Sequence, residues 1–72
     1  MRQVTIVQEN LIRVIEEKGL IKKGVAERAD MTAQAFSDIL QGRKVIRADM
    51  VPALADAVGV PIPELFRTAG GN

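Results

Sequence analysis

Apolar residues recur at helical spacing along most of the chain. The first stripe predicts a helix over about residues 6–18, which Gly19 ends. Its buried side is expected to consist of Val7, Leu11, Val14 and either Ile15 or Val4. Ile6 and Ile12 lie off this stripe, either as isolated surface residues or as part of an interface. The pattern favours no sheet, apart from a possible extended stretch at residues 4–7.

Residues 24–44, GVAERADMTAQAFSDILQGRK, have the small, apolar and capping residues that two steeply crossing helices need. In the first helix, over about residues 22–29, Val25 and Ala29 share one face. Ala26 beside them is small enough for a second helix to cross closely. The first half of this segment therefore predicts a helix that packs against its successor.

A break at Asp30 and Met31 separates this helix from the next. Thr32 follows as an N-cap whose hydroxyl can accept a hydrogen bond from an unpaired amide, and Gly42 ends the second helix. Its buried side is expected to consist of Phe36, Ile39 and Leu40. Its outward side carries a small, polar set of residues, Ala33, Gln34, Ser37, Asp38 and Gln41. Such a face can enter the major groove of DNA.

A loop over residues 42–45 precedes a further helix over about residues 50–58, which Gly59 ends. Asp49 is positioned to cap this helix. Pro52 requires the start to lie close to Asp49, because proline is tolerated only in the first turn.

A last short helix is expected near Pro61 and Pro63, since both prolines are compatible with a helix start. The residues expected to close the core there are Ile62, Leu65 and Phe66. We expect a single domain over residues 1–68 and a flexible tail over residues 69–72.

Taken together, these segments resemble the phage-repressor and Cro-like helix-turn-helix family. The resemblance extends beyond the central segment to EEKGL at residues 16–20, MVPALADAVGV at residues 50–60 and PELF at residues 63–66. It implies an all-α fold, the compact five-helix lambda-repressor-like DNA-binding domain with a central helix-turn-helix. It also implies a sequence-specific transcriptional regulator, with a repressor as the expected type, that inserts the helix at about residues 33–41 into the major groove of double-stranded DNA.

The resemblance also assigns roles to individual residues. Gln34 is the best candidate for reading a base, because its amide can bond adenine through two hydrogen bonds. Asp38 would either accept a hydrogen bond from cytosine or orient a basic side chain such as Arg43, with a structural or solvated acid as the alternative. The full set of expected base-reading positions is Ala33, Gln34, Ser37 and Asp38. Phosphate contacts are expected from Lys22, Lys23, Thr32, Arg43 and Lys44, with solvated surface charges as the alternative for the loop residues.

Several positions depart from the family pattern. Ile21 occupies the place of a capping Ser or Thr, and Gly24 weakens its helix by about 1 kcal/mol relative to alanine. Asp30 stands where glycine is common because the backbone is often left-handed there, a conformation that Asp tolerates. Lys22 replaces a common glutamine, so a phosphate contact is expected from it.

A homodimer on a palindromic operator is the expected assembly, since one recognition helix reads only a few base pairs. Relatives often pair through the last helix and its flanks. The candidate interface residues are Val60, Ile62 and Phe66, with a core role as the alternative for Phe66.

Composition excludes several other classes. The 72 residues are 47% hydrophobic and 26% charged, which is typical of one soluble globular domain. Histidine and cysteine are absent, and neither a phosphate-binding glycine loop nor a metal-ligand spacing is present, so we expect no enzyme, metal, cofactor or small-molecule ligand. No apolar run approaches the roughly 20 residues of a membrane span, which makes the cytoplasm the default location.

The formal net charge of +1, from ten Lys and Arg against nine Asp and Glu, is low for a nucleic-acid-binding protein. The charges are unevenly distributed, because basic residues flank the two central helices whereas Asp49, Asp56 and Glu64 lie in the C-terminal third. The low charge leaves one alternative function, a protein-interaction module of the same fold such as an antitoxin or an adaptor.

Overall fold

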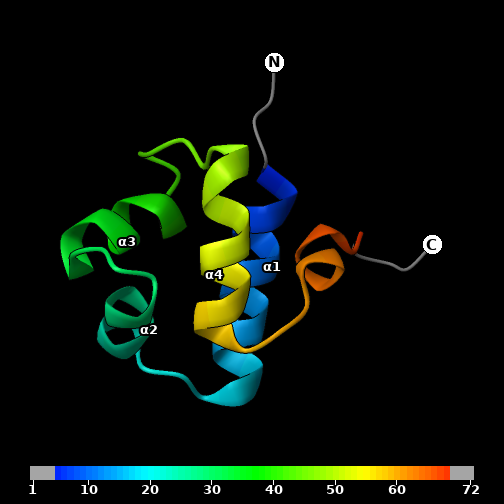
Figure 1. Ribbon diagram of the computed structural model, residues 1–72, viewed down its shortest axis with the longest axis horizontal. Coiled ribbons are helices and arrows are strands. Elements are labelled where there is room, and N and C mark those ends of the chain that lie inside the picture. Colours follow the sequence, from blue (N-terminus) through cyan, green and yellow to red (C-terminus); the bar gives the residue numbers. More distant parts are fainter. Residues whose placement is uncertain (1–4, 69–72) are drawn as a thin grey trace.

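The computed structural model describes residues 5–68, and this part of the chain consists of helices joined by short loops, without a strand. Its elements are the helices α1 (Thr5–Lys18), α2 (Lys22–Arg28), α3 (Ala33–Leu40) and α4 (Val51–Val58), and the 3-10 helices η1 (Ala48–Met50) and η2 (Ile62–Phe66). The long α1 and the apolar α4 lie side by side, with α2 and α3 on one side of the pair and η2 on the other (Figure 1). The expected all-α class is confirmed. The expected fifth α-helix is wrong, because that segment forms the 3-10 helix η2.

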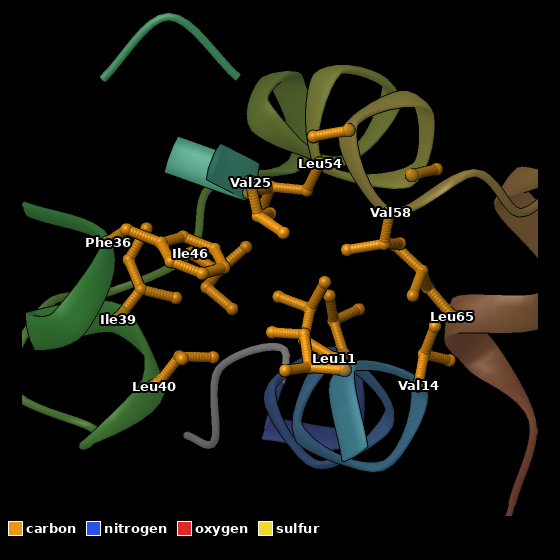
Figure 2. Close-up of a cluster of buried hydrophobic side chains, with 14 of the residues drawn as sticks. Leu11, Val14, Val25, Phe36, Ile39, Leu40, Ile46, Leu54, Val58 and Leu65 are labelled. Atoms are coloured by element: carbon orange, nitrogen blue, oxygen red, sulfur yellow. The ribbon is translucent and has the colours of Figure 1, made fainter. Parts of the chain in front are cut away.

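The hydrophobic core lies where all of these elements meet. Side chains of α1, α3, α4 and η2 point into a common centre (Figure 2). The α1 stripe is confirmed at Val7, Leu11, Val14 and Ile15, whereas Val4 lies outside the described residues. The extended alternative at residues 4–7 is wrong for residues 5–7, which belong to α1. Ile6 and Ile12, whose role the sequence left open, are half-buried against the core.

The 3-10 helix η2 buries less apolar surface than expected. Leu65 is fully buried and lies near Val14 and Val58 (Figure 2). Ile62 and Phe66 retain 42% and 44% exposure, so the expectation that both close the core is wrong. Of the apolar side chains in the five-residue η2, Leu65 alone is buried in the core beside α1 and α4.

A polar side chain that the sequence did not single out attaches η2 to α1. Asn10 is 5% exposed, and its amide nitrogen lies 2.7 Å from the Leu65 carbonyl oxygen and 2.8 Å from that of Arg67. Arg13 in turn donates to the Asn10 side-chain oxygen over 2.8 Å. Because buried amides need partners, these bonds specify where η2 docks.

The start of α4 also differs from expectation. Asp49 lies within η1, and the N-cap of α4 is Met50, which makes no capping side-chain bond. Pro52 does lie in the first turn of α4, as expected. At the other end Gly59 has φ +77°, a left-handed conformation that favours glycine. The predicted tail at residues 69–72 lies outside the described residues.

Candidate nucleic-acid interface

The turn between α2 and α3 is built as the sequence predicts. Asp30 adopts the left-handed conformation with φ +63°, and the Met31 amide donates to the Ala26 carbonyl over 3.0 Å. The hydroxyl of Thr32 accepts a hydrogen bond from the Ala35 amide at 3.0 Å, which confirms Thr32 as the N-cap of α3. The arrangement of α2 and α3 is therefore determined by residues close to the turn that joins them.

The helix α3 has one buried and one outward side. Its buried residues are Phe36, Ile39 and Leu40, as predicted. On the outward side Ala33 and Gln34 are exposed, and Ser37 and Asp38 are half-buried. The four expected base-reading positions thus share one accessible face, which we call the α3 face, with Gln41 at its end.

Hydrogen bonds link the polar side chains of the α3 face in pairs. The Gln34 amide nitrogen donates to Asp38 Oδ1 at 3.0 Å, and the Gln41 amide nitrogen donates to the Ser37 hydroxyl at 3.0 Å. Arg43 Nε lies 3.5 Å from the same Asp38 Oδ1. The predicted alternative in which Asp38 orients Arg43 therefore has a matching contact.

The loop after α3 holds two further cations beside the α3 face. The amides of Arg43 and Lys44 donate to the Asp38 carbonyl over 2.8 and 3.2 Å, which folds the loop back against the end of α3. Both side chains are exposed. Lys22 and Lys23, also exposed, begin α2. Ile21 precedes them as an N-cap without a capping side-chain bond, as expected.

Two other cations near α2 are engaged elsewhere. Lys18 donates to the carbonyls of Val58 and Gly59 over 3.0 and 3.1 Å, and Arg28 donates to the Ala57 carbonyl over 3.0 Å. These residues supply positive charge to the C-terminal end of α4, where carbonyls lack helical partners. We therefore do not count Lys18 and Arg28 among the cations available to the α3 face. The local sequence could not show this, because their partners lie 29 to 41 positions away along the chain.

The expected interface residues lie away from the α3 face. Ile62 and Phe66 are exposed on η2, which lies on the opposite side of the α1–α4 pair from α3 (Figure 1). Val60 is half-buried against the core. The structure thus places Ile62 and Phe66 on a different side of the domain from the α3 face. Two further exposed apolar residues lie near the central helices, Ile21 before α2 and Val45 after α3.

Within residues 5–68, no helix is both long enough and apolar enough to cross a membrane.

Comparison with known proteins gives a match to the model of a family described as "Helix-turn-helix domain", over residues 13–68. Two crystal structures are similar in fold. The clp gene regulator ClgR from C. glutamicum is 18% identical with a TM-score of 0.76, and the match covers 83% of this chain and 78% of that one. The restriction-modification controller protein C.AhdI from Aeromonas hydrophila is 19% identical with a TM-score of 0.76, and the match covers 88% of this chain and 96% of that one. No curated protein sequence matches the chain.

Proposed function

The chain belongs to the helix-turn-helix domain family, as its resemblance to the Cro-like repressors predicts, and from this premise we propose that it is a sequence-specific DNA-binding transcriptional regulator that acts as a repressor. The α3 face carries this proposal, because it is a polar surface on a capped helix that lies outside the core. In the proposed complex α3 enters the major groove. One structural neighbour is described as a gene regulator and the other as a controller protein, which supports the same role.

The proposal divides the polar residues into two groups. Gln34 reads a base through its amide, Ser37 contacts a neighbouring base edge, and Ala33 meets a thymine methyl group. Asp38 is the fourth member of the base-reading face. The cations and hydroxyl that contact phosphates, and so supply affinity and orientation, are Lys22, Lys23, Thr32, Arg43 and Lys44.

A homodimer on a palindromic operator completes the proposal. A single α3 reads only a few base pairs, and a two-fold dimer reads two half-sites about one helical turn apart. The exposed Ile62 and Phe66, with Val60 at their edge, support a pairing surface at η2 that leaves α3 free. We place the protein in the cytoplasm, in contact with the nucleoid.

The proposal is tested by selecting bound duplexes from a random-sequence pool and titrating the enriched site at several salt concentrations. We expect an enriched palindrome, and Gln34→Ala should lower affinity at specific positions of it. Lys23→Gln should reduce the slope of log K against log[salt] by about 0.9, because the variant neutralises one phosphate fewer. Arg67→Gln removes an exposed cation on the far side of the domain and is the matched control, for which the slope should not change.

Failure to enrich any sequence, with weak binding at low salt only, would contradict DNA recognition. The small net charge of +1 and the carboxylate of Asp38 on the α3 face favour a protein-interaction module, such as an antitoxin or adaptor, in that case.

The assembly is tested separately by sedimentation equilibrium. Phe66→Asp places a charge on the η2 surface and should shift the protein toward monomer. Val45→Asp is the control, because Val45 is 56% exposed in the loop before η1 and takes no part in the proposed pairing. Equal effects of the two substitutions would contradict pairing through η2.

A further inference from the structure

Asp38 makes contacts in three directions at the centre of the α3 face. Its Oδ1 accepts a hydrogen bond from the Gln34 amide nitrogen at 3.0 Å and lies 3.5 Å from Arg43 Nε. Its backbone carbonyl accepts hydrogen bonds from the Arg43 and Lys44 amides. The carboxylate is half-buried, with 31% of its side chain exposed, so it is held between a proposed base-reading residue and a proposed phosphate contact.

The chemistry of this contact determines which end of the Gln34 amide faces Asp38. A glutamine amide has an accepting oxygen at one end and a donating NH2 group at the other. A carboxylate has acceptors only, so the reversed amide would bring two oxygens together. Gln34 therefore directs Nε2 toward Asp38, and its Oε1 is left for another partner.

The groups that remain free on Gln34 match some base edges and not others. Oε1 needs a donor, and Nε2 retains a second hydrogen that needs an acceptor. Adenine offers both in the major groove, at N6 and N7, and cytosine offers a donor at N4. Guanine presents O6 and N7 and thymine presents O4, all of them acceptors, so each can accept a hydrogen bond from Nε2 but leaves Oε1 without a donor.

We propose that Asp38 is a positioning residue that fixes the orientation of the Gln34 amide, so that α3 prefers adenine, which pairs with both free groups of Gln34, over guanine and thymine, which leave Oε1 without a donor, at one operator position. This inference rests on the proposed function, because it concerns how the same α3 face discriminates between bases. Asp38 acts through Gln34 and needs no base contact of its own.

Arg43 accounts for how an acidic residue is tolerated on a surface that faces phosphates. Its Nε lies beside the Asp38 carboxylate, and 63% of its side chain remains exposed. The pair brings a positive charge next to the acid, which reduces repulsion between Asp38 and the DNA backbone. Arg43 thus contributes to affinity, whereas the Gln34–Asp38 bond sets the base preference.

The test compares variants on four duplexes that differ only at the base pair that Gln34→Ala identifies in the selected operator. The wild type should bind the adenine duplex about 5- to 150-fold more tightly than the guanine duplex. Asp38→Asn keeps the shape of the side chain, but its NH2 group can donate to Gln34 Oε1, so the Gln34 amide is no longer held in one orientation. The adenine-to-guanine ratio should then fall below about threefold. Arg43→Gln should weaken all four duplexes alike and preserve the ratio.

The outcomes separate this inference from the function on which it rests. If Asp38→Asn leaves the adenine-to-guanine ratio unchanged, or if the wild type selects guanine or thymine there, the inference is wrong while DNA recognition stands. Absence of any enriched operator overturns both.

A second measurement needs no DNA. In the free protein, a side-chain NH2 resonance of Gln34 should shift in Asp38→Asn, whereas the Gln41 resonance, whose partner is Ser37, should not. If Asp38→Asn fails to fold, Asp38→Ser replaces it in both experiments. An unmoved Gln34 resonance would contradict the inference.

Discussion

The α2–α3 side of the molecule and the α1–α4–η2 side are held together over very different distances along the chain. The side-chain hydrogen bonds that lie within the α2–α3 side join near neighbours, such as Thr32 with Ala35 and Gln34 with Asp38, three and four positions apart. On the other side Asn10 bonds to Leu65, 55 positions away, and Lys18 bonds to Gly59, 41 positions away. Two side chains connect the two sides. Arg28 of α2 donates to the Ala57 carbonyl, and Gln8 of α1 donates to the Leu40 carbonyl at the end of α3.

Because of this difference, the two sides have different roles in the domain. The turn between α2 and α3 and the N-cap of α3 are formed by residues of these two helices and their linker. The rest of the domain covers their buried side chains, Val25, Phe36 and Ile39. Because the outward residues of α3 take no part in the long-range contacts, they can change base preference without disturbing the core. The α1–α4–η2 side, in contrast, depends on bonds that form only once the whole chain has folded.

The largest effect is expected where a long-range bond is buried. Asn10→Ala leaves the buried Leu65 carbonyl without its partner, which should lower the free energy of unfolding by about 1–3 kcal/mol. Urea denaturation measures this change. Glu9→Ala, one residue earlier on the exposed side of α1, is the control and should change stability little. Similar decreases for the two variants would show that the bonds to η2 do not stabilise the domain.

The same division explains what could be predicted from the sequence. The N-cap Thr32 and the buried and outward sides of α3 follow from residues within one or two turns of each other, so they were predictable from the local sequence. The left-handed conformation of Asp30 was implied by the family resemblance. The capping of α4 by Lys18 and Arg28 was not predictable, because a local pattern carries no information on which distant carbonyl a cation meets.

The core near the C-terminus shows the same limit. Ile46 is buried although it lies in the loop between α3 and η1, where no helical period identifies it. Ile62 and Phe66 have the apolar character of core residues but are exposed, because hydrophobicity alone does not say which side of a short 3-10 helix faces the core. The α3 face was predictable for the opposite reason, since its helix has one clear apolar side.

The next effect concerns a local signal of the helix-turn-helix. Thr32→Ala removes the acceptor for the Ala35 amide and should lower the free energy of unfolding by about 1 kcal/mol. Thr32→Ser retains the hydroxyl and should restore most of this stability. Thermal unfolding of the three proteins tests this, and a serine variant as unstable as the alanine variant would contradict the capping role.

A smaller effect, of opposite sign, is expected inside α2. Gly24→Ala should raise the free energy of unfolding by up to about 1 kcal/mol, because alanine restricts the unfolded chain and favours a helix. Among the residues that the structure describes, no other atom lies within 4 Å of the Cβ position beyond the immediate helix. The matched control is Gly59→Ala, which should destabilise because the backbone there is left-handed, with φ +77°. Urea midpoints that move in the same direction for both would contradict this assignment.

The smallest effect is expected at η1, the junction between the two sides. Arg47 holds the Asp49 carboxylate with two contacts, Nε to Oδ1 at 3.3 Å and Nη2 to Oδ2 at 3.0 Å. The hydrogen bond from Arg47, and then its charge, lower the pKa of Asp49 below its ordinary value.

Since the pKa of Asp49 is lower in the folded state, the stabilising contribution of this pair is present above the ordinary pKa of an aspartate and is lost as the pH falls through the lowered value. Both side chains are fully solvated, so the change in stability should be slight and should decrease in high salt.

An NMR titration of the Asp49 carboxyl is the sensitive measurement. Arg47→Gln should return the pKa of Asp49 toward its ordinary value, and Arg47→Lys, which keeps the charge but not the paired contacts, should return it only in part. A pKa of Asp49 that does not respond to either substitution would mean that the two contacts do not persist in solution, and that η1 joins the two sides through its backbone and its apolar neighbours alone.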